Sequence, residues 1–370
     1  MFFTCTRIGL PWQRTRTLAT TVTREKLPCR TLPFGKLVYA QRFCNMTSLA
    51  TDKDVKQTWR TSMNDKGEFV RKTSAFRNWI TADGSSGFKA EANRYHLYVS
   101  LACPWAHRAL IVRKLKGLDD VISVTVVDWL LGEGGWSFTD AKPKCSLDTL
   151  NNSTFLKEVY RKADPEYSGS ITVPCLWDKQ KQTVVNNESS EIIRMFNSEF
   201  NTLGKTDEQR KLNLYPEDVK GKIDAVNEWV YPQINNGVYR CGFARSQEAY
   251  NTAVKELFDG LDKVEAILSK SRYLAGNQLT EADVRLFTTL VRFDTVYHTH
   301  FKTNKRRIVD YPNTWAYVRD VYQLPDVAET VDQEHIMKHY FESHKSINPF
   351  GIVPVGPDLD FMAPHNRDKM

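Results

Sequence analysis

The sequence predicts an α+β fold in its first half and an all-helical fold in its second half. Segments with strand-like alternation or many β-branched residues occur only between residues 95 and 186, where helical segments separate them. From residue 216 to about residue 342 the apolar periodicity is almost entirely helical. No apolar run approaches the roughly 18 residues that a membrane span needs, and the mean hydropathy is -0.47. These observations favour a soluble globular protein without a membrane role.

The first half begins with a predicted β-α-β order. Residues 95–100 (YHLYVS) alternate as a strand, and after Cys103 a helical stretch runs to Gly117, which is expected to end the helix. Residues 121–128 (VISVTVVD) are rich in β-branched side chains and predict the second strand.

A long connection and a predicted β-β-α order follow. Residues 130–170 are polar and rich in glycine, with a short helix expected around residues 155–162. Residues 173–178 and 183–186 predict two short strands joined by a polar turn, and residues 189–196 predict a helix with one apolar face.

The second half follows a polar linker at residues 201–211. Its helices are predicted at residues 219–230, 246–268, 280–295, 314–321 and 331–341. Thr280 and Asp283 have the spacing of a capping box, which marks the start of one of these helices. We therefore divide the chain into a leader (1–50), an irregular extension (51–94), an α+β domain (95–200), a helical domain (211–345) and a tail (346–370).

The basic charge is concentrated at the N-terminus. The formal net charge is +7. Residues 1–51 hold eight of the 51 basic residues and one of the 44 acidic residues, which leaves 43 of each in the remainder. A neutral body argues against nucleic-acid binding. Residues 1–24, with four arginines and no acids, resemble a mitochondrial presequence. The alternatives are a disordered extension or initiation at Met46, and these leave the expected location as mitochondrial, cytoplasmic or both.

The cysteines do not form a disulfide or metal pattern. The seven are Cys5, Cys29, Cys44, Cys103, Cys145, Cys175 and Cys241, without a CxxC pair or Cys/His zinc spacing. We expect no metal, and we interpret Cys145, Cys175 and Cys241 as structural.

Cys103 is the exception, because it lies between a predicted strand and a predicted helix. The free amides and the dipole of a helix N-terminus stabilise a thiolate, and Pro104 at the first helical position needs no amide partner. The sequence therefore predicts a nucleophilic cysteine, against the alternative of a small side chain packed under the helix. The residue three positions later is Ala106, so a mixed disulfide at Cys103 must be resolved by an external thiol.

Two further positions are candidates for ligand binding. If the Val173-Pro174 bond is cis, the backbone of Val173 is free to pair with a peptide-like ligand; a trans proline at an edge strand is the equal alternative. Glu188 and Ser189 open a predicted helix whose amides suit a carboxylate, although the same pattern serves simple capping.

Several long strings resemble one family. These are YVSLACPWAHRAL at 98–110, VNNESSEIIR at 185–194, INNGVYRCGFA at 234–244, LTEADVRLFTTLVRFDTVYHTHFK at 279–302 and INPFGIVPVGP at 347–357. They are similar to the xi class of omega-like glutathione transferases, the glutathionyl-hydroquinone reductases. The resemblance implies glutathione transferase architecture, in which a thioredoxin-like α+β domain precedes an all-α domain, and it implies a homodimer.

The resemblance also implies roles for individual residues. Cys103 would form a mixed disulfide with glutathione, the co-substrate. Glutathione would be bound by Trp136, Arg161, Val173, Glu188 and Ser189, with Arg161 at its glycine end. Tyr215 and Tyr297 would donate hydrogen bonds to the oxygens of the hydroquinone.

The implied activity is the reduction of S-glutathionyl-(chloro)hydroquinones to hydroquinone and glutathione disulfide. One alternative is an omega-type thioltransferase or dehydroascorbate reductase, which needs Cys103 but neither tyrosine. The other is a non-catalytic binding module with the same fold.

Overall fold

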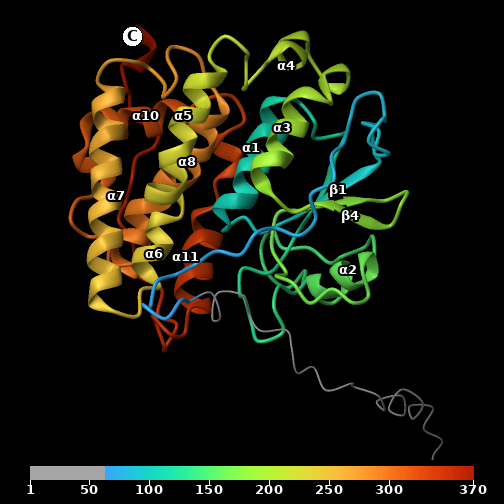
Figure 1. The fold of residues 1–370 in the computed structure, drawn as a ribbon, viewed down its shortest axis with the longest axis horizontal. Coiled ribbons are helices and arrows are strands. Elements are labelled where there is room, and N and C mark those ends of the chain that lie inside the picture. The colour runs from blue at the N-terminus through green and yellow to red at the C-terminus, as the bar shows by residue number, and fades with distance from the viewer. Residues whose placement is uncertain (1–62) are drawn as a thin grey trace, which may run out of the picture. The chain divides into compact units, whose positions relative to one another are not determined.

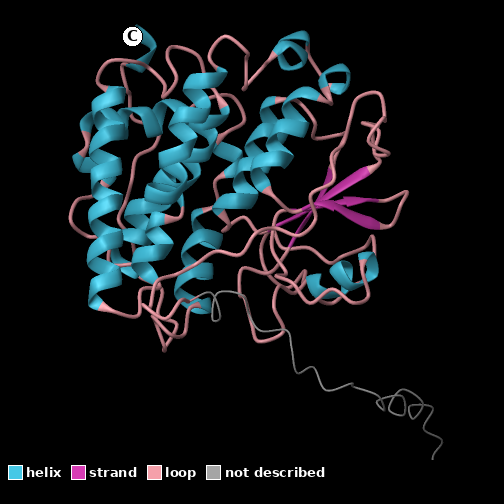
Figure 2. Ribbon diagram, viewed as in Figure 1, coloured by secondary structure: helices cyan, strands magenta, loops and turns pink. Residues whose placement is uncertain are grey.

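A four-stranded mixed sheet forms the centre of the first half (Figures 1 and 2). The computed structural model describes residues 63–370, so the predicted leader lies outside the described residues. The strands are β1 (Tyr95–Val99), β2 (Ser123–Val126), β3 (Cys175–Asp178) and β4 (Thr183–Asn186), in the order β2-β1-β3-β4. β1 is parallel to β2 and antiparallel to β3, and β3 is antiparallel to β4.

The four strands lie where the sequence predicts them; β4 has the predicted bounds, and the other three are shorter. β2 covers four residues of the predicted eight, because its ladder with β1 extends only from the pair His96–Ser123 to the pair Val99–Val126. β1 is buried along its whole length, which is typical of an internal strand between two packed faces.

Helices cover both faces of this sheet. α1 (Pro104–Leu115) and α3 (Ser189–Ser198) lie on the side facing the helical half, and α2 (Leu156–Ala163) lies on the other side (Figure 1). α1 packs against α3 and also against α8 of the helical half. Gly117 follows α1 with φ +63°, a backbone conformation that favours glycine, as expected for a helix end.

The second half is helical, as predicted. Its helices are α4 (Asp207–Lys211), α5 (Lys220–Val230), α6 (Gly237–Gly242), α7 (Gln247–Leu268), α8 (Glu281–Arg292), α9 (His298–His300), α10 (Pro312–Tyr322) and α11 (Gln333–Ser343). α4 lies inside the segment predicted as a polar linker, because a capping box of Thr206 and Gln209 starts a short helix there. The predicted box at α8 is present, with the Thr280 amide donating to Asp283 Oδ2 at 2.8 Å.

Two π-helical segments were not predicted: Tyr231–Asn235, between α5 and α6, and Phe293–Tyr297, after α8. No described helix is both long enough and apolar enough to cross a bilayer.

The described part of the extension, residues 63–94, holds no named helix or strand and runs beside the sheet. Asn78 donates its amide to the Val185 carbonyl at 3.0 Å, and the Asn187 amide donates to the Phe76 carbonyl at 3.1 Å. These bonds hold the extension along β4 and the start of α3. As a result, the residues just before Phe76 lie at the edge of the pocket described below.

Candidate active site

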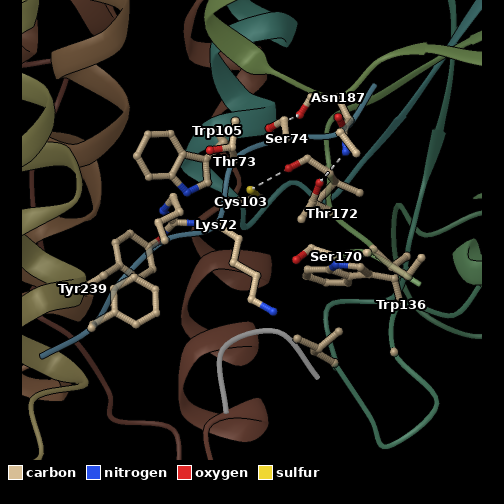
Figure 3. Close-up of a pocket in the computed structure, with 18 of the residues that line it drawn as sticks. Lys72, Thr73, Ser74, Cys103, Trp105, Trp136, Ser170, Thr172, Asn187 and Tyr239 are labelled. Atoms are coloured by element: carbon tan, nitrogen blue, oxygen red, sulfur yellow. Dashed lines mark hydrogen bonds between the residues drawn. The ribbon is translucent and has the colours of Figure 1, made fainter. Parts of the chain in front are cut away.

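A pocket of about 200 Å³ opens between the two halves of the chain (Figure 3). Its lining comes from the extension, the α+β half and the helical half. The residues are Phe69, Arg71, Lys72, Thr73, Ser74 and Ala75; Cys103, Trp105, Leu131, Gly135, Trp136, Tyr167, Gly169, Ser170, Ile171, Thr172, Val173 and Asn187; and Tyr239, Phe243, His339 and His344.

Cys103 lies in this pocket at the N-cap of α1, with Pro104 at the first helical position, as the sequence predicts. Its Sγ donates a hydrogen bond to the Val173 carbonyl at 3.5 Å, which Figure 3 shows as a dashed line. The Val173–Pro174 bond is cis, which settles the alternative that the sequence leaves open. The Cys103 thiol therefore contacts Val173, the residue whose backbone is expected to pair with a peptide-like ligand.

Burial opposes the thiolate that the helix end favours. Cys103 is only 9% exposed, and this burial raises the pKa of its thiol, while the amides of Ala106 and Trp105 and the charges of Arg292 and Arg71 act in the opposite direction. The helix end is visible in the sequence, whereas the burial of Cys103 arises only from the fold. Before ligand binds, the thiol form therefore predominates at neutral pH.

Arg292 supplies a buried positive charge beneath this position. It comes from the last residue of α8, and its guanidinium donates to the carbonyls of Ala102 at 2.9 Å and Leu101 at 3.1 Å. It also donates to His107 Nδ1 at 2.9 Å. Burial lowers the pKa of His107 well below its ordinary value, so this histidine is neutral and accepts the hydrogen bond without adding a second positive charge. Arg292 thus joins the helical half to the residues immediately before Cys103.

We expect the pH dependence of Cys103 alkylation to report the pKa of its thiol, which burial raises and the nearby amides and positive charges lower. In the protein without ligand, its rate with iodoacetamide should keep rising above about pH 8.5, the ordinary thiol pKa, because burial raises the pKa. Arg292→Gln should move the midpoint of the rate–pH curve higher, since it removes a charge that favours the thiolate, whereas Arg292→Lys should retain most of the effect. A midpoint that is unchanged or lower in Arg292→Gln, with the fold intact by circular dichroism, would contradict this account.

The structure brings most of the expected glutathione-binding residues to the pocket or its edge. Trp136 and Val173 line it, and the ring of Trp136 stacks on that of His339 at 5.1 Å. Glu188 is the N-cap of α3, where its carboxylate accepts from the Ser190 amide at 3.1 Å and from the Ser74 hydroxyl at 3.1 Å. Ser189 is buried in the first turn of the same helix.

Two expected residues lie away from the pocket, and a third, Tyr297, is buried behind it rather than in its lining. Arg161 is exposed in the last turn of α2 and does not belong to the described lining. Tyr215 also lies outside it: the Tyr215 hydroxyl donates to Asp224 Oδ2 at 2.7 Å, and the guanidinium of Arg194 lies 3.9 Å from its ring centre. The phenol of Tyr215 is therefore already paired with a carboxylate elsewhere.

Three other tyrosines form a chain of hydroxyls behind the pocket. Tyr239 lines the pocket, and its hydroxyl lies 2.6 Å from that of Tyr340. The Tyr340 hydroxyl lies 2.9 Å from that of Tyr297, which is fully buried. Burial raises the pKa of all three phenols, so each retains its proton as a hydrogen-bond donor. Tyr297 therefore reaches the pocket through Tyr340 and Tyr239.

Sequence reasoning missed Tyr239, Tyr340 and Arg71. Tyr239 lies inside the string INNGVYRCGFA at 234–244, so a signal for it was present. Tyr340 and Arg71 come from segments where periodicity or composition alone gives no indication of a site. Among residues 63–370, no group of three or more side chains suited to hold a metal ion is present.

Two family models match this chain. "Glutathione S-transferase, N-terminal domain" matches residues 102–199, and "Glutathione S-transferase, C-terminal domain" matches residues 247–320.

The chain is also similar to curated proteins and solved structures over most of its length. It is 56% identical to "Glutathionyl-hydroquinone reductase YqjG" of Escherichia coli over 84% of this chain and 95% of the relative. Identity to "Glutathionyl-hydroquinone reductase PcpF" of Sphingobium chlorophenolicum is 48%, over 82% and 94%. The crystal structure of "glutathione-S-transferase Xi" from Phanerochaete chrysosporium has 54% identity and a TM-score of 0.77, over 80% and 99%. The glutathione-bound structure of YqjG has 57% identity and the same TM-score, over 80% and 96%. The chain therefore belongs to the glutathione S-transferase family, within the group that contains the xi-class transferases and the glutathionyl-hydroquinone reductases.

Proposed function

We propose that this protein is a glutathione-dependent reductase of S-glutathionyl-(chloro)hydroquinones that works through a disulfide between Cys103 and glutathione. The observation that carries the proposal is the meeting of the Cys103 thiol and the Tyr239 phenol in the same pocket. A thiol suits attack on a glutathione sulfur, and a protonated phenol suits a quinol oxygen. Glutathione is bound in the solved structure of the relative YqjG.

Glutathione would lie along the α+β side of the pocket. The backbone of Val173 would pair with the peptide, as an added strand does. The γ-glutamyl end would lie at the start of α3, where the Glu188 carboxylate suits the ammonium and the helix amides near Ser189 suit the carboxylate. Trp136 would cover the tripeptide from the opposite wall.

The first step transfers the glutathionyl group to Cys103. The thiolate attacks the glutathione sulfur, and the carbon–sulfur bond to the ring breaks. Before the bond breaks, the ring carbon that bears sulfur takes up a proton and a ring hydroxyl loses one, which gives a keto tautomer. The electron pair of the breaking bond then passes through the ring to this oxygen, which takes up a proton as the hydroquinone leaves. The two sulfurs are thereby oxidised to a disulfide, and the ring carbon is reduced.

The second step restores the thiol. The thiolate of free glutathione attacks the glutathione sulfur of the mixed disulfide and releases glutathione disulfide and Cys103. Position 106 is Ala106, so the described site offers no second CxxC thiol, in agreement with an external resolving thiol.

The tyrosine chain would act in the first step. As the carbon–sulfur bond breaks, negative charge develops on a ring oxygen. Tyr239 would donate to that oxygen, and its own hydroxyl would be polarised by Tyr340 and Tyr297 behind it. Donors fixed before the reaction stabilise such a charge without reorganisation.

Turnover of three substrates tests the proposed activity. We expect rapid, glutathione-dependent release of menadiol from glutathionyl-menadiol, with slower reduction of hydroxyethyl disulfide and little conjugation of a chlorodinitrobenzene. Activity with the disulfide alone would favour an omega-type thioltransferase, and the absence of all three activities would favour a binding module.

We also propose that the protein is a homodimer. Large apolar side chains of the tail are exposed, with Phe350 at 87%, Ile352 at 70% and Val355 at 101% relative exposure. Exposed apolar side chains that come close together in one segment suit an interface between subunits. We expect a dimer in sedimentation velocity and a shift toward monomer in Val355→Asp; a wild-type monomer at micromolar concentration would contradict the proposal.

A further inference from the structure

The pocket lining carries two positive charges and no negative ones. Arg71 and Lys72 are cationic, and the described lining contains neither Asp nor Glu. Burial lowers the pKa of His339 to about 4, and it lowers the pKa of His344 well below its ordinary value. Both histidines are therefore neutral near pH 7, and the charge of the lining is +2 from Arg71 and Lys72.

Arg71 is held in a fixed orientation. Its Nε donates to Asn236 Oδ1 at 3.0 Å. Its guanidinium carbon lies 4.7 Å from the ring centre of Trp105 and 5.1 Å from that of Tyr239. These contacts are to an amide oxygen and to aromatic rings, so they restrict the guanidinium without neutralising its charge; within residues 63–370 no carboxylate pairs with it.

Lys72 reaches into the same space. Figure 3 shows its side chain extending into the pocket, with Tyr239 on one side and Trp136 on the other. Within residues 63–370 its ammonium has no carboxylate partner. Arg71 and Lys72 both come from the irregular extension, which β4 and the start of α3 hold in place through the Phe76 and Asn78 contacts.

Bound glutathione neutralises only part of this charge. As a thioether it carries two carboxylates and one ammonium, so its net charge is −1 near neutral pH. In the proposed binding mode the Glu188 carboxylate pairs with the ammonium and the helix amides pair with the γ-glutamyl carboxylate at the start of α3. The glycine carboxylate is then the one negative group of glutathione left for Arg71 and Lys72, so one of these two positive charges is left over. Arg71 lies against the ring of Tyr239, the phenol proposed to contact the quinol, so the surplus charge is beside the aromatic half of the substrate rather than beside the start of α3.

We infer that Arg71, together with Lys72, forms a subsite for a carboxylate on the quinol ring, so that the preferred substrates are glutathione thioethers of dihydroxylated aromatic acids. The inference rests on the proposed reductase function and specifies its substrate class. An arginine fork held against aromatic rings can match a carboxylate with two parallel hydrogen bonds, and the lysine adds a second charge.

The test compares two substrates that differ only in this group: the glutathione conjugate of a dihydroxybenzoic acid and the conjugate of its methyl ester. Because the glutathionyl group is the same, the ratio of kcat/KM for acid over ester isolates the ring carboxylate. We expect a ratio of about 10 or more in the wild type, since charge-assisted hydrogen bonds are about twice as strong as neutral ones. Lys72→Met and Arg71→Met should each lower the ratio, and the double variant should bring it close to one.

Matched variants separate charge from folding. Lys66 is exposed in the same extension and lies outside the lining, so Lys66→Met should leave the ratio unchanged. Lys72 is exposed as well, so Lys72→Glu is expected to fold. Its ratio of kcat/KM for acid over ester should be lower than that of Lys72→Met. This comparison tests the inference even if Arg71→Met proves unstable.

Two results would overturn the inference while leaving the reductase function intact. The first is equal turnover of acid and ester by the wild type. The second is an unchanged ratio in the variants with a raised KM for free glutathione in disulfide reduction, which would mean that the two cations bind the tripeptide. Failure of the wild type to turn over either conjugate would instead overturn the proposed function, and the substrate class with it.

Discussion

Replacing Cys103 with serine is expected to lower kcat/KM for a glutathionyl-hydroquinone by about 10³-fold or more, because a hydroxyl is a far weaker nucleophile than a thiol toward sulfur. Cys103 lies at the start of α1, in contact with the Val173 carbonyl. The described pocket lining contains no other thiol that could replace it. The measurement is steady-state release of hydroquinone at saturating glutathione.

Cys145→Ser is the matched control for this substitution. Cys145 is partly exposed and bonds to the Val127 carbonyl at 3.5 Å, outside the pocket lining. We expect its variant to retain activity within about twofold, as is usual for a substitution that touches no substrate. Comparable losses in both variants would show that general destabilisation, rather than loss of the nucleophile, explains the result.

Tyr239→Phe is expected to have the second largest effect, a loss of about 10²-fold in kcat for the quinol substrate, which is typical of removing one oxyanion donor. The substitution keeps the ring against Trp105 and Arg71 and removes only the hydroxyl that lies 2.6 Å from Tyr340. Reduction of hydroxyethyl disulfide forms no ring oxyanion, so its rate should change by less than about threefold.

Tyr215→Phe is the control for the phenol prediction. Its hydroxyl is bonded to Asp224 and lies outside the pocket lining, so we expect equal and small effects on both substrates. Tyr297→Phe should have an intermediate effect, because Tyr297 reaches the pocket only through Tyr340. A selective loss of quinol turnover in Tyr215→Phe, with Tyr239→Phe unaffected, would show that Tyr215 rather than Tyr239 donates to the quinol oxygen.

Patterns among neighbouring residues predicted β1, β2 and the start of α1, because these elements depend mainly on residues close in sequence. The alternation at residues 95–100 and the β-branched run at 121–128 gave β1 and β2, and the strand–Cys–Pro–helix order located Cys103 at the start of α1. The ends of β2 could not be predicted in the same way, because the length of its partner strand sets them. α4 and the two π-helical segments are too short for a periodicity signal.

The site was predictable only where its residues are close in sequence to the thiol or to a helix start. Glu188 and Ser189 show a capping pattern, and Trp136 followed from the family resemblance alone. The choice between Tyr215 and Tyr239 depends on tertiary packing, which places the hydroxyl of Tyr239 beside that of Tyr340, far away in the sequence. Neither tyrosine carries that information in its neighbours. Arg71 belongs to a segment without periodicity, which the sequence describes only as irregular.

The most direct test of the central claim is a single turnover without free glutathione. Stoichiometric protein and glutathionyl-menadiol are mixed, menadiol is quantified, and the protein is digested without reduction for mass spectrometry. The account predicts about one menadiol released per active site and one glutathione attached to the peptide that contains Cys103, with glutathione disulfide appearing only after free glutathione is added. Release of menadiol that requires free glutathione from the start, with no adduct on Cys103, would contradict the account.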